Sequence, residues 1–139
     1  MTHPLTHLLL FVLWTLLMLG ITLAGRATLV LLGKARANAF PPYSYDPGRF
    51  FDRSARAYQN CLETLPVLAA LVLASEITGF HSEAGVFTLW VLIARLFQSS
   101  IHLVGAGHWL VFIRFHFFLV QVVLMAWLAA ALLANWWPY

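Results

Sequence analysis

Residues 53–66 read RSARAYQNCLETLP and run directly into residues 67–74, eight positions without a polar side chain. Arg53, Arg56, Asn60 and Glu63 are spaced three or four residues apart, which places them along one face of a helix. Ionisable residues inside an apolar helix usually face the interior of a membrane bundle together with a partner. The segment therefore predicts a transmembrane helix that is polar on one face where it begins and apolar where it ends.

The whole chain has the composition of an integral membrane protein. Of its 139 residues, 62% are hydrophobic and 9% are charged, and the mean hydropathy is +0.83, whereas soluble domains carry roughly 25% charged residues. The net charge of +3 comes without a basic groove interleaved with aromatic residues, so we do not expect nucleic acid as a partner. A single cysteine excludes an internal disulfide bond.

Four apolar stretches are long enough to cross a bilayer, which takes about 20 residues. They predict helices at about 5–33, 49–78, 84–104 and 109–135, within a single domain that spans residues 1–139. The first stretch exceeds the roughly 7–15 apolar residues of a signal peptide, so we expect a retained helix. Three prolines between residues 40 and 48 predict a loop, and the other connections are short enough for antiparallel neighbours. The expected fold is an all-α membrane four-helix bundle.

Basic residues flank alternate loops of this bundle. The first loop and the third are accompanied by Lys34, Arg36, Arg49, Arg53, Arg56 and Arg114, whereas the N-terminal tail and the second loop have no lysine or arginine. By the positive-inside rule, the first and third loops are expected in the cytoplasm and both termini on the other side. The final residues, NWWPY, are expected to anchor the last helix at a membrane surface.

The polar face of the second helix predicts a pocket. At a rise of 1.5 Å per residue, Glu63 lies roughly 15 Å below Arg53, and a carboxylate at that depth needs a partner. Arg95, at a similar depth on the third helix, is the expected one. Arg95, Gln98 and His102 form a second polar stripe, so the pocket is expected between the two stripes. A purely structural ion pair between Glu63 and Arg95 would explain both residues without a pocket, and this alternative stands beside the first.

The chemistry of such a pocket suits a small ligand with more than one carboxylate, because a guanidinium holds a carboxylate through two parallel hydrogen bonds. Glu63 would meet an ammonium group of the same ligand. Other sites are not expected. His3 and His7 are four residues apart but lie at the opposite end of the bundle, so we predict no metal site. His102 and His116 lie at or near the cytoplasmic interface, where histidines are usually hydrated, so we predict no haem site. Cys61 points off the polar stripe and is expected to pack rather than react.

The segment RSARAYQNCLETLP resembles the second-helix signature of the MAPEG family, the membrane-associated proteins of eicosanoid and glutathione metabolism, through Arg56, Asn60, Glu63 and Pro66. Residues 94–97 (ARLF) and 113–114 (IR) resemble further family positions, so the resemblance covers essentially the whole chain. It implies a bacterial-type homotrimer in the inner membrane, with periplasmic termini. Glutathione, the implied cofactor, would bind at the cytoplasmic side between subunits.

By the same resemblance, the implied function is that of a glutathione-dependent transferase or peroxidase acting on a lipophilic electrophile, with membrane lipid and a lipophilic small molecule as partners. Arg114 would be catalytic, because it matches the family arginine that stabilises the glutathione thiolate. The residues that would form or support the glutathione site are Arg53, Arg56, Gln59, Asn60, Glu63, Arg95, Gln98 and His102.

Two other functions are weighed against this one. Phe115 stands where some members of the family have a serine directly after the catalytic arginine, and the family includes a non-enzymatic lipid-binding scaffold. A non-catalytic scaffold that binds a lipid or an amphiphile is therefore the alternative. A transporter or channel ranks last, because the far halves of the four helices offer no polar path across the bilayer.

Overall fold

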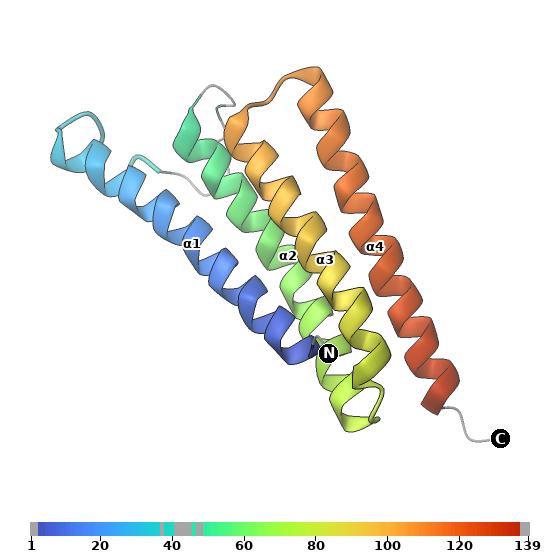
Figure 1. Ribbon diagram of the computed structural model, residues 1–139. Coiled ribbons are helices and arrows are strands. Elements are labelled where there is room, and N and C mark those ends of the chain that lie inside the picture. Colours follow the sequence, from blue (N-terminus) through green and yellow to red (C-terminus); the bar gives the residue numbers. More distant parts are fainter. Residues whose placement is uncertain (1–2, 37, 41–45, 47–48, 137–139) are drawn as a thin grey trace.

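The computed structural model describes residues 3–36, 38–40, 46 and 49–136, and four helices make up most of this part (Figure 1). They are α1 (Pro4–Leu31), α2 (Phe50–Ile77), α3 (His81–Val104) and α4 (His108–Trp136). Each is long and apolar enough to cross a membrane, which confirms the predicted all-α fold. Helix α3 begins at residue 81 rather than 84. Most of the predicted proline loop and the end of the aromatic tail, residues 137–139, lie outside the described residues.

Glycines in the left-handed backbone region end the first two helices. At the end of α1, Gly33 has φ of 67°, its N–H donates to the Val30 carbonyl at 3.0 Å, and the N–H of Lys34 donates to the Leu29 carbonyl at 2.9 Å. This pair of hydrogen bonds is the Schellman motif, which glycine favours because it has no Cβ. Gly79, with φ of 72°, ends α2 in the same way. Both helices therefore stop where the sequence becomes polar.

The four helices run up and down, with α2 and α3 in the middle (Figure 1). Helix α1 packs on both α2 and α3, whereas α4 packs mainly on α3 and touches α2 less. The beginning of α1 and the end of α4 lie at the same end of the bundle. The end of α1, the beginning of α2 and the α3–α4 connection lie at the other end, so the basic residues that flank them lie at one end of the bundle.

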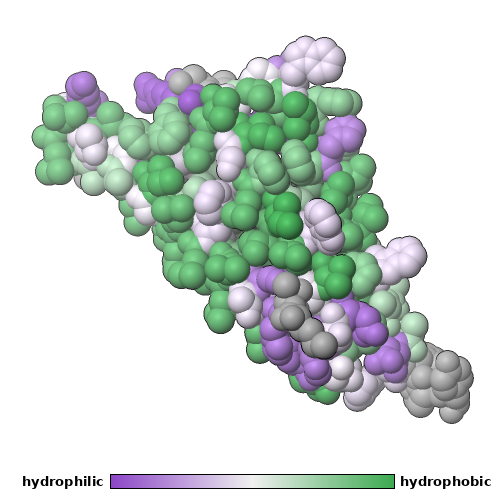
Figure 2. Space-filling model, in the orientation of Figure 1, coloured by the Kyte–Doolittle hydropathy of each residue, from purple (hydrophilic) through white to green (hydrophobic). Residues whose placement is uncertain are grey.

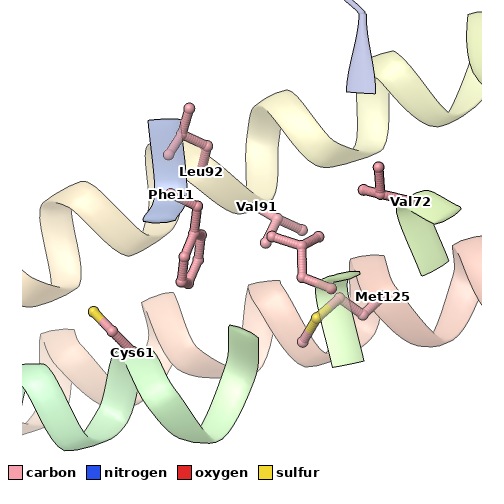
Figure 3. Close-up of a cluster of buried hydrophobic side chains, with 7 residues drawn as sticks. Phe11, Cys61, Val72, Val91, Leu92 and Met125 are labelled. Carbon is pink, nitrogen blue, oxygen red and sulfur yellow. The ribbon is translucent and has the colours of Figure 1, made fainter. Parts of the chain in front are cut away.

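The hydrophobic core takes side chains from all four helices (Figure 3). Its fully or nearly buried members are Phe11, Cys61, Leu68, Val72, Val91, Leu92 and Met125. Many leucines and phenylalanines remain exposed on the outer faces, and hydrophobic residues cover most of the face seen in Figure 2. Lipid tails solvate such a surface as well as a protein interior does, so exposure carries no penalty inside a bilayer.

Polar side chains join the helices inside the bundle. The Thr22 and Ser54 hydroxyls lie 3.0 Å apart and connect α1 to α2. The His7 Nδ1 atom lies 2.9 Å from the Thr88 hydroxyl and connects α1 to α3. In membrane proteins, hydrogen bonds and small residues supply much of the helix association that the hydrophobic effect supplies in water. These hydrogen-bonding side chains therefore lie inside the bundle beside the hydrophobic core, and most of the outer surface is apolar.

The close contact of Gly25 on α1 with Phe51 on α2 predicts a pair of opposite stability effects. Gly25→Ala is expected to destabilise the bundle by about 1–3 kcal/mol, because the new Cβ would overlap the ring of Phe51. Gly20→Ala is the matched control on the same helix. Nothing lies within 4 Å of its Cβ, so alanine gains up to about 1 kcal/mol of helix propensity there. Unfolding by dodecyl sulfate in mixed micelles measures both changes, and equal effects would contradict the close packing at Gly25.

Candidate functional site

The polar stripe of α2 lies along an edge of the bundle rather than inside it. Arg53 and Asn60 are half-buried, whereas Arg56 and Glu63 are exposed. The residues that follow them, at positions 54, 57, 61 and 64, are buried. One residue corresponds to about 100° of helix rotation, so the stripe is turned sideways from the core. The predicted spacing is correct, but the prediction that the stripe faces the bundle interior is wrong.

A polar cleft of about 260 Å³ lies at this edge, between α2, α3 and α4. Its lining residues are Asn60, Glu63, Gln98, Val111, Arg114, Phe115 and Phe118. The structure thus brings three of the predicted binding residues into a single cleft with Arg114, the predicted catalytic arginine. They are Asn60 and Glu63 of the α2 stripe and Gln98 of the α3 stripe.

His102 lies behind the cleft and makes hydrogen bonds to two of its lining residues, Asn60 and Arg114. Its Nδ1 atom lies 2.7 Å from a guanidinium nitrogen of Arg114, and its Nε2 atom lies 2.9 Å from the side-chain amide of Asn60. A guanidinium can only donate, so Nδ1 must accept, and the ring is neutral with its proton on Nε2. That proton needs an acceptor. The structure sets the Asn60 Nδ2 atom against Nε2, so the amide must be turned by 180° for its oxygen to accept this proton. Its NH₂ group is then left for other partners.

Gln121 is a site residue that the sequence reasoning missed. Its side-chain N–H group donates to the Gln98 amide oxygen at 2.9 Å and to the Phe117 carbonyl at 2.9 Å, and both glutamines are buried. The sequence could have indicated this residue. Gln121 is the one polar residue between positions 117 and 126, and it lies seven residues, or two helical turns, after Arg114. The bond between the glutamines fixes α4 against α3 beside the cleft.

Arg95 lies in the core, not in the cleft. It is fully buried, donates to the Thr64 hydroxyl, and places its guanidinium carbon 5.5 Å from the centroid of the Phe11 ring, which is a cation–π distance. No ion pair joins it to Glu63 within the described part of the chain. The predicted Glu63–Arg95 pair is wrong within one subunit, because α2 turns Thr64 inwards and Glu63 outwards.

The remaining predicted residues surround the cleft without lining it. Arg53 donates through Nε to the Leu103 carbonyl at 3.3 Å and lies over the Phe50 ring, so it ties the beginning of α2 to the end of α3. Arg56 and Gln59 lie on α2 at positions that do not line the cleft. These three residues can support the site, whereas Asn60, Glu63 and their partners across the cleft can contact a ligand.

An apolar groove of about 390 Å³ continues from the polar cleft between α2 and α4. The two cavities share Glu63 and Phe118. Beyond them the groove is lined by Thr64, Val67, Leu71, Val122, Met125, Ala126 and Ala129. One edge of the bundle therefore offers a charged compartment and an apolar compartment that meet at Glu63.

Comparison with known proteins gives one match. The family model described as the MAPEG family matches residues 4–134, which is nearly the whole chain. No curated protein and no solved structure matches.

The hydrogen-bond network predicts opposite tautomers for two histidines. At neutral pH, His102 should carry its single proton on Nε2, because Arg114 occupies Nδ1. His116 is the internal control, since its Nδ1 atom lies 2.9 Å from the Phe112 carbonyl and must donate to it. Nitrogen NMR of protein labelled at histidine distinguishes the two forms. A doubly protonated His102, or a proton on its Nδ1, would contradict the network.

Proposed function

The chain belongs to the MAPEG family, and on that premise we propose that it is a glutathione-dependent transferase or peroxidase acting on a lipophilic electrophile in the membrane. The observation that carries the proposal is the junction of the polar cleft with the apolar groove at Glu63 and Phe118. A polar thiol substrate and an apolar electrophile need two such compartments with a common boundary.

The donor set of the cleft fits glutathione, a tripeptide with two carboxylates, one ammonium group and a thiol. Arg114 offers a guanidinium for an anionic group, and Glu63 offers a carboxylate for the ammonium group. The amide NH₂ of Asn60, which the His102 bond leaves for other partners, can donate to a peptide carbonyl or a carboxylate. Charge-assisted hydrogen bonds of this kind are roughly twice as strong as neutral ones.

Arg114 is the residue we assign to catalysis. Bound glutathione supplies the thiol that attacks the electrophile, but a thiol with a pKa near 8.5 is mostly protonated at neutral pH. A nearby positive charge lowers that pKa and increases the thiolate fraction. Arg114 is buried, so its charge is less screened than at a surface. The Nδ1 atom of His102, 2.7 Å away, holds the guanidinium at the wall of the cleft.

A homotrimer would complete this site. The cleft of about 260 Å³ is smaller than the roughly 300–1,000 Å³ of most small-molecule sites. Arg56 and Glu63 are exposed within a membrane-spanning helix, and lipid covers charged groups at a cost of several kcal/mol. A neighbouring subunit over this edge would enlarge the site and shield both charges. The basic loops favour a cytoplasmic location for the site and a periplasmic one for the termini, as expected in a bacterial inner membrane.

The alternative function is a non-catalytic scaffold that binds a lipid or an amphiphile. Phe115 follows Arg114 and lines the cleft, so an apolar ring occupies a place where a hydroxyl would assist a reacting sulfur. Conjugation of glutathione to chlorodinitrobenzene separates the two functions, because a scaffold should show no rate above the uncatalysed background.

Titration calorimetry with glutathione tests the proposed ligand. The detergent-solubilised protein should bind glutathione and generate an ultraviolet thiolate band. In Arg114→Gln we expect the band to disappear while affinity falls by about tenfold, or 1.4 kcal/mol, because one of several contacts is lost. Arg36→Gln removes a cation outside the cleft and should retain the band. The proposal fails if millimolar glutathione does not bind.

Native mass spectrometry tests the assembly. Protein released from detergent micelles should have three times the subunit mass of 15.7 kDa. Glu63→Lys places a repelling cation at the edge that the neighbour would cover and should reduce the trimer fraction, whereas Ile77→Lys, at the exposed end of α2, should not. A stable monomer or dimer of the unaltered chain would contradict the trimer.

A further inference from the structure

A further cavity, distinct from the polar cleft and the apolar groove, lies on the other side of α2 from the polar cleft. It encloses about 1070 Å³ between the end of α1 and the beginning of α2. Its basic lining residues are Arg26, Lys34, Arg36 and Arg49, and its apolar ones include Leu29, Phe40, Phe50 and Phe51. None of the described residues lines both this cavity and the polar cleft.

The cavity exists because α1 leaves the bundle before it ends. The last buried position of α1 is Gly25, where the helix touches Phe51. Figure 1 shows α1 diverging from α2 beyond the middle of the bundle. The final turns of α1 therefore stand away from α2, and the turn at Gly33 brings Lys34 and Arg36 back over the space between them.

The charge of the cavity is strongly positive. Asp52 is the one acidic residue among its described lining residues, and Arg49 pairs with Asp46 at 3.3 Å. Arg26 stacks on the Phe40 ring with 5.5 Å between the guanidinium carbon and the ring centroid. Among the described residues, no carboxylate lies within 4 Å of Arg26, Lys34 or Arg36. Three cations thus share one cavity without an ion-pair partner in that part of the chain.

We propose that this cavity binds the headgroup phosphate of an anionic phospholipid. Guanidinium and ammonium groups are the side chains that bind phosphate oxygens most strongly. Basic pockets between transmembrane helices on the cytoplasmic side are suited to anionic headgroups, because that leaflet carries the negative surface potential. The N-cap residue of α2, Arg49, makes no side-chain capping bond, so the N–H groups of the first turn of α2 also favour an anion.

A lipid fits better than free phosphate because the cavity also has an apolar wall. Leu29, Phe40 and Phe50 line it beside the basic groups. Just outside, Leu31 and Leu32 are 86% and 61% exposed, so the surface next to the cavity is apolar where acyl chains would run. A headgroup held by Arg26 and Arg36 would place its glycerol and tails against this surface.

Native mass spectrometry with added lipid tests the proposal independently of glutathione. The protein should retain phosphatidylglycerol at concentrations at which phosphatidylcholine is lost. The double variant Arg26→Gln with Arg36→Gln should weaken phosphatidylglycerol binding by tenfold or more, since each basic residue near an anionic headgroup contributes about fivefold. Arg56→Gln removes one cation at the same end of the bundle but outside the cavity, and should leave lipid binding unchanged.

Four results would overturn the proposal. Equal retention of the two lipids would show that the cavity has no preference for an anionic headgroup. Equal losses in Arg56→Gln and the double variant would show general attraction to charge rather than a built site. Displacement of phosphatidylglycerol by millimolar inorganic phosphate would identify a free-phosphate site. Loss of glutathione affinity in the double variant would assign the cavity to the glutathione site of the assembly. Arg36→Gln alone, at an exposed position, gives the same test with a smaller loss if the double variant does not fold.

Discussion

Hydrogen bonds between polar side chains of neighbouring helices are the interactions on which the rest of this structure depends. A bilayer supplies neither water to solvate a buried polar group nor a hydrophobic force that favours one apolar face over another. Every packed pair of helices with extensive contact has such a bond. They are Thr22–Ser54 for α1 and α2, His7–Thr88 for α1 and α3, Thr64–Arg95 for α2 and α3, and Gln98–Gln121 and His102–Arg114 for α3 and α4.

The candidate site is built from the same bonds that hold the bundle. Arg114 reaches the cleft because the Nδ1 atom of His102 fixes its guanidinium, and the Asn60 side-chain amide is held against the other ring nitrogen of His102. Gln121 and Gln98 keep α4 at the distance that leaves the cleft open. The geometry of the site and the stability of the α3–α4 contact therefore depend on the same side chains. A substitution of His102, Arg114, Gln98 or Gln121 is expected to affect both.

The sequence predicted the helices well and the rotation of their faces poorly. Helix positions follow from hydropathy, because any 20-residue apolar run must cross the bilayer as a helix. The inward face is harder to assign, since lipid-facing and core leucines have the same character in the sequence. The spacing placed Arg56, Asn60 and Glu63 on one face correctly, yet the core lies one residue further round, at Cys61 and Thr64. Arg95 was paired with Glu63 because the two lie at a similar depth, and the structure gives it Thr64 as a partner instead.

Arg95 also limits which substitutions the interior of the bundle tolerates. Its side chain is fully buried, where a charged group is stable only with partners that replace water. Here those partners are the Thr64 hydroxyl on α2 and the Phe11 ring on α1. One side chain of α3 therefore fixes the relative depth of three helices, and the loss of either partner would leave its charge exposed to an apolar interior.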